Sequence, residues 1–362
     1  MKLKHEFKHL FAFVLVLLLL CSSLTGCSNT KNGSNENIER TVTDMTGQTI
    51  ELPKKVEKVF CDWASGITLI MTLGATEKLV AAHSAFETDS FAWAREICPQ
   101  IEAVVKDDAP FSNAEAILNY SPDLVVTNNK DNIETYKNLG LTVVYVDYNS
   151  NASFKESMSI VGTALGMDEK AAADRYNAYF DGNMRLVQER LADLTEADKP
   201  SVYYMDSRFG DAYHTVGAGE IQEDWVTIAG GVLATATEFE GRNLEITAEK
   251  LLEIDPEFIL IGAQKQAEVY ELLMADDVLA GLNAVKSNSV YRIPQGIFPW
   301  CRTGPEAAMQ VVWAAKLLHP ELFSDIDLID LTKNFYKDFY ESEVSLDSIN
   351  GILSGKVCPE GK

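Results

Sequence analysis

The chain has 362 residues, 46% of them hydrophobic, and a formal net charge of -23 at pH 7. This hydrophobic content can fill one large core or two smaller ones, and two lobes suit the length better. The phosphate backbone of a nucleic acid repels so acidic a surface. The composition therefore predicts a globular protein that binds neither DNA nor RNA.

The first residues have the pattern of a secretion signal. Lys2, Lys4 and Lys8 precede an unbroken apolar run over residues 10–20, and that run has only half of the ~20 residues that a membrane-spanning helix needs. The sequence Leu-Thr-Gly then leads directly to Cys27. This arrangement is typical of a lipoprotein, in which residues 1–26 are removed and Cys27 is acylated. The alternative is ordinary cleavage nearby, for which the sequence offers no Ala-x-Ala site.

A polar stretch separates Cys27 from the folded part of the chain. Residues 28–39 contain a single apolar residue, Ile38, so we expect residues 27–40 to form a flexible tether. Acyl chains on Cys27 would hold the folded part at a membrane surface without a spanning helix. Removal of residues 1–26, with three lysines and one glutamate, takes the formal charge from -23 to -25.

Four cysteines lie in the folded part. None of them has the spacing of a zinc site. Outside the cytoplasm they allow three complete disulfide pairings, and the sequence does not choose among these. They are Cys61, Cys98, Cys301 and Cys358.

Short apolar runs that alternate with helical patterns predict two α/β lobes. Residues 41–149 form the first lobe, with strands at 56–60, 78–82, 123–127 and 141–146 and helices at 67–73, 113–119 and 132–139. Residues 199–362 form the second, with strands at 201–205, 258–261 and 289–293, a helix at 247–253, and amphipathic helices at 305–318 and 328–340 that pack on its sheet.

The segment between the lobes, residues 150–198, is predicted to be mainly helical. Apolar residues recur there at three- or four-residue spacing without a proline, and Gly166 marks an expected break. The predicted fold class is α/β, with two Rossmann-like lobes linked by a long helix and a ligand cleft between them. An extracellular enzyme is the alternative from another class, but the chain has no G-x-S-x-G, H-E-x-x-H or P-loop motif.

A phrase of the sequence occurs twice. Residues 112–126 and 246–260 both run from a helix cap through a helix and a proline into a strand. With the Val-Thr-Asp-Met-Thr-Gly opening at residue 42 and the Pro-Gln-Gly strand exit at residue 294, this phrase resembles the ABC-importer substrate-binding proteins for iron-siderophores, haem and cobalamin. The resemblance covers residues 41–340.

The resemblance implies a monomeric, non-catalytic binding protein without a cofactor, held by lipid on the extracytoplasmic face of the cell membrane. It would deliver an iron-siderophore or related iron complex to an ABC permease. Corrinoid, haem or an oxyanion such as molybdate are alternative ligands, and a stand-alone surface receptor is an alternative role. In this family one glutamate on each lobe docks with the permease, and the matching residues are Glu115 and Glu249. Both also have positions that suit helix capping.

The resemblance places the ligand between the lobes, where residues just past the strands meet. An exposed loop tryptophan at position 300 would supply a flat apolar surface. Arg302 would offer a planar guanidinium that can donate paired hydrogen bonds to a carboxylate, catecholate or oxyanion. For each aromatic residue, the alternative role is packing between the lobes. For each arginine, the alternative is a surface ion pair. The predicted ligand-binding residues are Trp63, Ser65, His83, Phe86, Arg208, His214, Trp225, Arg242, Trp300 and Arg302, with Asp62, Trp93, Tyr213 and Phe298 as further candidates.

His83 and His214 follow strands in different lobes, so they are candidates to face each other across the cleft. Tyr213 or His214 would be the axial ligand if the solute were haem. The chain lacks the dense set of histidines and carboxylates that a bare divalent cation requires. The sequence therefore predicts a metal that arrives already chelated, and no metal site of the protein's own.

Overall fold

The computed structural model describes residues 40–356 of the chain. The signal sequence, Cys27, the tether up to residue 39 and Cys358 lie outside these residues. Within them, no helix combines the length and the apolar character needed to cross a bilayer.

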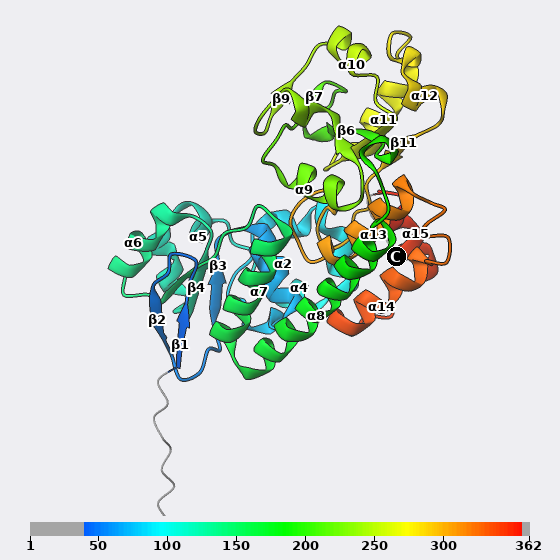
Figure 1. Cartoon of the computed structure of the whole chain (residues 1–362). Coiled ribbons are helices and arrows are strands. Elements are labelled where there is room, and N and C mark those ends of the chain that lie inside the picture. Colours follow the sequence, from blue (N-terminus) through cyan, green and yellow to red (C-terminus); the bar gives the residue numbers. More distant parts are fainter. Residues whose placement is uncertain (1–39, 357–362) are drawn as a thin grey trace, which may run out of the picture. The chain divides into compact units, whose positions relative to one another are not determined.

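The first lobe is built on a parallel sheet with the strand order β3-β4-β5 (Figure 1). Three of the four strands predicted for this lobe are present in it. A separate antiparallel hairpin, β1-β2, precedes the sheet. These strands are β1 (Arg40–Thr43), β2 (Thr49–Leu52), β3 (Val59–Cys61), β4 (Leu124–Thr127) and β5 (Val143–Tyr145).

Two elements predicted for the first lobe differ in the structure. Residues 78–82 form no strand, because Leu79 and Ala82 each make only one isolated bridge, directly after the 3₁₀ turn Thr76–Lys78. The segment Ala114–Asn119 is a 3₁₀ helix instead of an α-helix. Both segments are short, and such segments depend on their neighbours more than on intrinsic preference.

The second lobe contains a four-stranded parallel sheet with the order β11-β10-β6-β8. A small antiparallel pair, β7-β9, lies outside this sheet. The three strands predicted for this lobe, β6, β10 and β11, are all present. The strands are β6 (Ser201–Asp206), β7 (His214–Thr215), β8 (Val232–Leu233), β9 (Leu244–Glu245), β10 (Phe258–Gly262) and β11 (Val290–Arg292).

Both parallel sheets are covered on their two faces. In β3, Val59 and Cys61 belong to the main core, whereas Phe60, between them, belongs to a separate cluster on the other face. In β6 the same alternation places Tyr204 in the main core and Tyr203 in a second cluster. This period of two is the geometry of a strand.

Two consecutive helices connect the lobes: α7 (Asn151–Leu165) and α8 (Met167–Arg190), green in Figure 1. They meet at Gly166, as the sequence predicted, and a capping box between Ser150 and Ser153 begins α7. Helix α7 packs on β1, α2 and α9, and α8 packs on α9 and α13. The link is therefore two packed helices instead of one long helix.

The remaining helices surround the sheets. They are α2 (Ala64–Thr72), α3 (Ala92–Ile97), α4 (Gln100–Ala103), α5 (Ala109–Ser112), α6 (Lys130–Asn138), α9 (Ile221–Ile228), α10 (Ala248–Ile254), α11 (Gln266–Ala275), α12 (Asn283–Lys286), α13 (Ala307–Leu318), α14 (Leu328–Tyr340) and α15 (Leu346–Leu353).

The end of the described chain returns to the first lobe. Helix α14 packs on α2, where the Tyr340 hydroxyl lies 2.7 Å from Thr72 Oγ1. Trp93 Nε1, from α3, donates to the Lys356 carbonyl at 2.9 Å. The sequence predicted that residues 328–340 pack on the second sheet and gave no sign of these contacts with the first lobe.

Three cysteines lie within the described residues, and all three are unpaired and buried. They are Cys61, Cys98 and Cys301. Burial raises the pKa of each thiol, so each stays protonated at neutral pH. The three described cysteines form no disulfide with one another.

Candidate functional site

A cavity of about 320 Å³ lies where the carboxyl ends of the two parallel sheets meet. The first lobe contributes residues that follow β3, β4 and β5, and the second contributes the end of β6 and several loops. The lining residues are Trp63, Ser65, Asn128, Tyr148, Asn149, Tyr204, Asp206, Arg208, Val216, Glu220, Ile221, Gln222, Arg242, Phe298, Arg302 and Thr303.

The first-lobe wall is a small hydrogen-bonded group around Tyr148. Its hydroxyl lies 2.8 Å from Ser65 Oγ and accepts a bond from Trp63 Nε1 at 3.3 Å. Burial raises the pKa of Tyr148, which keeps the phenol neutral. Ser65 Oγ also donates to the Thr303 carbonyl at 2.8 Å, so one hydroxyl connects the two lobes at the cavity.

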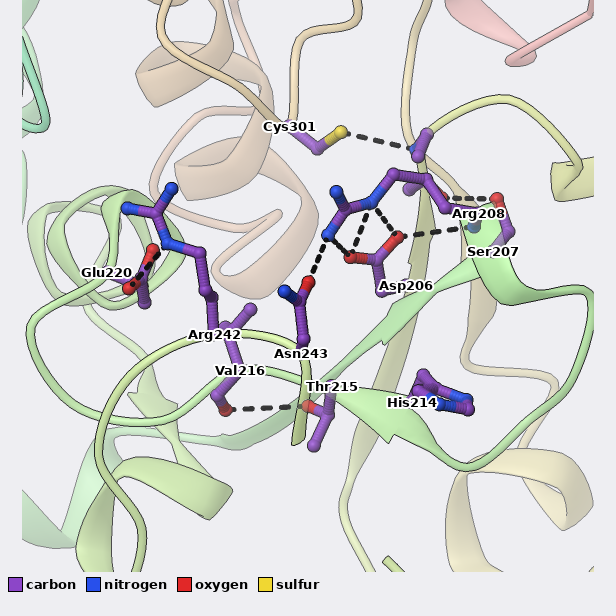
Figure 2. Close-up of polar contacts among 12 residues, drawn as sticks. Asp206, Ser207, Arg208, His214, Thr215, Val216, Glu220, Arg242, Asn243 and Cys301 are labelled. Atoms are coloured by element: carbon purple, nitrogen blue, oxygen red, sulfur yellow. Dashed lines mark hydrogen bonds and ion pairs between the residues drawn. The ribbon is translucent and has the colours of Figure 1, made fainter. Parts of the chain in front are cut away.

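Arg208 is fixed by a buried carboxylate (Figure 2). Its Nε lies 2.9 Å from each oxygen of Asp206, and its Nη2 donates to the same carboxylate and, at 3.0 Å, to Asn243 Oδ1. Asp206 ends β6 and is only 2% exposed. The bonds to Asp206 raise the pKa of Arg208 further. This guanidinium is therefore charged and held in one orientation.

Two further arginines line the cavity, one with a carboxylate partner and one without a partner among the described residues. Arg242 Nε lies 3.3 Å from Glu220 Oε1 (Figure 2). The Arg302 side chain is half-buried, and its guanidinium has no hydrogen bond or ion pair with any residue of the described part. With Asp206 and Glu220 as the only carboxylates in the lining, the formal charge of the cavity is +1. A chain with a net charge of -23 thus encloses a cationic cavity.

The loop that carries Arg302 is anchored by a buried glutamate. Glu306 is 1% exposed and lies one residue before α13. Its Oε1 accepts bonds from the backbone nitrogens of Ile297, at 2.6 Å, and Phe298, at 3.4 Å, and from the Tyr336 hydroxyl at 3.2 Å. Gln222 Nε2 also donates to the Cys301 carbonyl at 3.0 Å. Bonds on both sides of residue 302 therefore set the position of this loop.

Five of the predicted ligand residues line this one cavity. They come from both lobes, and the three arginines among them are the charged part of the prediction. They are Trp63, Ser65, Arg208, Arg242 and Arg302, and the further candidate Phe298 lies with them.

The predicted aromatic residues Trp300, Trp225 and Phe86 lie elsewhere. Trp300 and Trp225 are each 1% exposed and Phe86 is fully buried, all in the main core. The expectation of an exposed tryptophan wall at position 300 is wrong, because the anchored loop turns this ring inward. Trp63 and Phe298 supply the aromatic surface of the cavity instead.

The two histidines proposed to face each other do not line the cavity. His83 caps a 3₁₀ turn by accepting from the Ala85 nitrogen at 3.0 Å. His214 Nδ1 lies 2.8 Å from Asp211 Oδ1, and its ring stacks on Phe209 with centroids 3.9 Å apart. Both imidazoles therefore have local partners.

Four lining residues that were not predicted lie at the end of a strand or within four residues after one. Asn128 follows β4, Tyr148 and Asn149 follow β5, and Asp206 ends β6. The rule that selected Trp63 would have found them, because parallel strands present their carboxyl ends at one edge. Glu220 lies in a loop and carries no such signal.

The structure places the two glutamates matched to permease docking on the surface. Glu115 lies in the 3₁₀ helix after Asn113, whose side chain accepts from the Glu115 nitrogen at 3.0 Å. Glu249 lies in the first turn of α10, where bonds from its own backbone nitrogen and from Thr247 lower its pKa. Both are exposed. Within residues 40–356, no group of three or more His, Cys, Asp or Glu residues is arranged to hold a metal.

The chain matches known binding proteins along most of its length. A family model described as periplasmic binding protein matches residues 62–296. The molybdate-binding protein MolA of Haemophilus influenzae is 22% identical over 354 residues, covering 91% of this chain and 99% of that protein. The Fe(3+)-citrate-binding protein YfmC of Bacillus subtilis is 21% identical over 296 residues, covering 78% and 88%. The iron(3+)-hydroxamate-binding protein YxeB of the same species is 20% identical over 202 residues, covering 55% and 59%.

Solved structures have the same fold. A periplasmic solute binding protein from Veillonella parvula superposes with a TM-score of 0.75 at 21% identity, over 87% of this chain and 96% of that one. MolA bound to molybdate superposes with a TM-score of 0.73 at 21% identity, over 85% and 99%. The predicted α/β class with two parallel-sheet lobes is thus confirmed.

Glu306 makes the stability of the protein depend on pH. Burial raises its pKa from 4.5 to about 7, and Tyr176, Tyr336 and Tyr340 around it provide no cation. The folded state then holds the proton more tightly than the unfolded state, so the stabilisation is complete below pH 4.5 and is lost as pH rises through about 7. Glu306→Gln cannot ionise, so its free energy of unfolding relative to the native chain should rise by on the order of 2–3 kcal/mol between acidic and mildly alkaline pH.

Urea unfolding of the native chain and of Glu306→Gln, each at an acidic and at a mildly alkaline pH, measures this difference in the free energy of unfolding. The matched control is Glu321→Gln, which removes an exposed carboxylate just beyond α13 and should leave the pH profile unchanged. A difference between Glu306→Gln and the native chain that stays constant with pH would contradict the prediction.

Proposed function

Because the chain belongs to the periplasmic binding protein family, the substrate-binding proteins of ABC importers, we propose that it captures a small anionic solute for import. The solute would lie in the cavity between the lobes at residues 41–149 and 199–362, which the segment at 150–198 joins. Such a protein acts by binding and delivery and catalyses no reaction. We expect it to work as a monomer.

The single observation that carries this proposal is the set of three arginines around one cavity. Arg208 and Arg302 have guanidinium donors available to a ligand, and Arg208 is already oriented by Asp206. Guanidinium groups bind carboxylates and oxyanions through paired, charge-assisted hydrogen bonds. Preorientation lowers the entropy that binding costs. A ligand with acidic oxygens therefore suits the cavity best.

The cavity accommodates a compact oxyanion such as molybdate. Its volume of about 320 Å³ lies at the lower end of the range of ~300–1,000 Å³ for ligand pockets. The protein named as molybdate-binding also matches nearly the whole chain. We therefore place the oxyanion ahead of the iron complex that the sequence analysis favoured.

A compact ferric chelate is the second candidate. Trp63, Tyr148 and Phe298 give the cavity aromatic walls that a bare oxyanion does not need. Two relatives are named for binding ferric citrate and ferric hydroxamate. A chelate with carboxylate oxygens would use the same arginines.

A thermal-stability screen of the purified chain tests the ligand class. Molybdate at a hundred times its dissociation constant should stabilise the folded state by about 2.7 kcal/mol and raise the midpoint, and ferric citrate, ferric hydroxamate, haem and cobalamin are compared with it. Arg302→Ala removes a charge-assisted contact and should weaken binding by about ten- to a hundredfold. Arg185→Ala, an exposed arginine of α8, is the matched control and should bind normally. A shift with cobalamin alone, or with no compound, would reject an anionic solute, and a shift with haem alone would reject a compact one.

We propose that Glu115 and Glu249 dock the loaded protein on its permease. Their exposure and their matching positions in the two repeated phrases support this role. The double variant Glu115→Gln/Glu249→Gln should lower solute uptake by cells at least about tenfold, because each lost charge leaves a partner unpaired at the interface. Its affinity for solute should be unchanged. Uptake equal to that of a Glu189→Gln/Glu321→Gln control would show that the two glutamates act only in helix capping.

We propose that Cys27 carries the lipid anchor. The apolar run before it and the polar stretch after it support this assignment. In cells, the native chain should sediment with membranes and carry the mass of acyl groups on an N-terminal cysteine. Cys27→Ala should be released from the membrane fraction. An unmodified native N-terminus at another residue would overturn the assignment.

A further inference from the structure

Two arginines of the cavity have carboxylate partners, and the two pairs differ in how firmly they are made. Arg208 and Asp206 share several hydrogen bonds, with Nε 2.9 Å from both carboxylate oxygens, and Asp206 is 2% exposed. Arg242 and Glu220 share one contact of 3.3 Å, and the Arg242 side chain is 68% exposed. The first pair is a fixed part of the wall, whereas the second is weak and reached by solvent.

The backbone beneath the weak pair is rigid. Gly217 N donates to the Gly241 carbonyl at 2.7 Å, and Gly241 N donates to the Ala218 carbonyl at 3.0 Å. A Cβ added at Gly217 would lie 2.3 Å from the Phe239 carbonyl oxygen, so only glycine permits this close approach. The loops that carry Glu220 and Arg242 are therefore held together, and any separation of the two charges is a movement of side chains.

Glu220 has no other partner to stabilise its charge. Its side chain is 15% exposed, and Arg242 is its sole ion-pair or hydrogen-bond partner among the described residues. Glu220 and Arg242 face each other (Figure 2), and both line the cavity, so the carboxylate lies where an anionic ligand would meet Arg242. It offers Arg242 the same type of oxygen that an oxyanion offers.

We propose that Glu220 is a built-in counter-ion that the incoming anion displaces from Arg242. This inference rests on the proposed function, since it presumes an anionic solute. With Glu220 turned away, Arg208, Arg242 and Arg302 face the solute with Asp206 as the remaining carboxylate, so the formal charge rises from +1 to +2. That charge complements a dianion such as molybdate. The empty site, in contrast, keeps Arg242 neutralised.

Calorimetric titration of the native chain and four variants tests the exchange. The probe is molybdate, or ferric citrate if that compound gives the larger thermal shift. Glu220→Gln should bind it about tenfold more tightly than the native chain, because the competing charge is gone. In an Arg242→Gln background the same substitution should change the affinity less than about twofold, because there is no longer an arginine to compete for. Glu240→Gln, an exposed residue two positions before Arg242, is the control for loss of one nearby charge and should bind like the native chain.

The outcomes distinguish ion exchange at Arg242 from repulsion at a distance and from a lack of anion binding. An equal gain from Glu220→Gln in both backgrounds would mean that Glu220 only repels the anion at a distance, and would overturn the exchange. No gain in the native background would overturn it as well, while leaving anion binding intact. Failure of the native chain to bind either probe would defeat the proposed function itself, and the counter-ion with it. Coincident thermal midpoints of the unliganded variants establish that all four proteins fold alike.

Discussion

A parallel sheet covered on both faces can present polar side chains only at its edges and strand ends. In this protein the alternation along β3 and β6 buries both faces of both sheets. The side chains available to a solute are therefore those just past the strands, and the two lobes bring these ends to one cavity. The location of the site follows from the burial of the sheets before any particular residue is considered.

Local charge at that site is opposite to the charge of the whole chain. The net value of -23 argues against nucleic acid as a partner but says nothing about a cavity whose own formal charge is +1. Two carboxylates there have different effects. Asp206 orients Arg208 and raises its pKa, which prepares a donor, whereas Glu220 occupies a donor of Arg242. In the proposed anion site, one negative charge next to an arginine would thus strengthen binding, and another would compete with it.

The sequence was sufficient for the fold class and for the three arginines of the cavity lining. Short apolar runs located β4, β6 and β10, and helical spacing located α8 with its break at Gly166. The prediction failed where burial depends on distant contacts. Trp300 follows a strand like Trp63, but the bonds of Glu306 turn its loop into the core. The pairing of Glu220 with Arg242 joins two irregular loops, and no periodicity encodes such a contact.

The contacts between the lobes bear on how the solute leaves. Hydrogen bonds join Ser65 to Thr303, Thr72 to Tyr340 and Trp93 to Lys356, and each connects the first lobe to the C-terminal part of the chain. These hydrogen bonds between the lobes oppose a wide hinge motion. If the protein docks on a transporter as proposed, release of the solute would then require the transporter to strain these hydrogen bonds from outside.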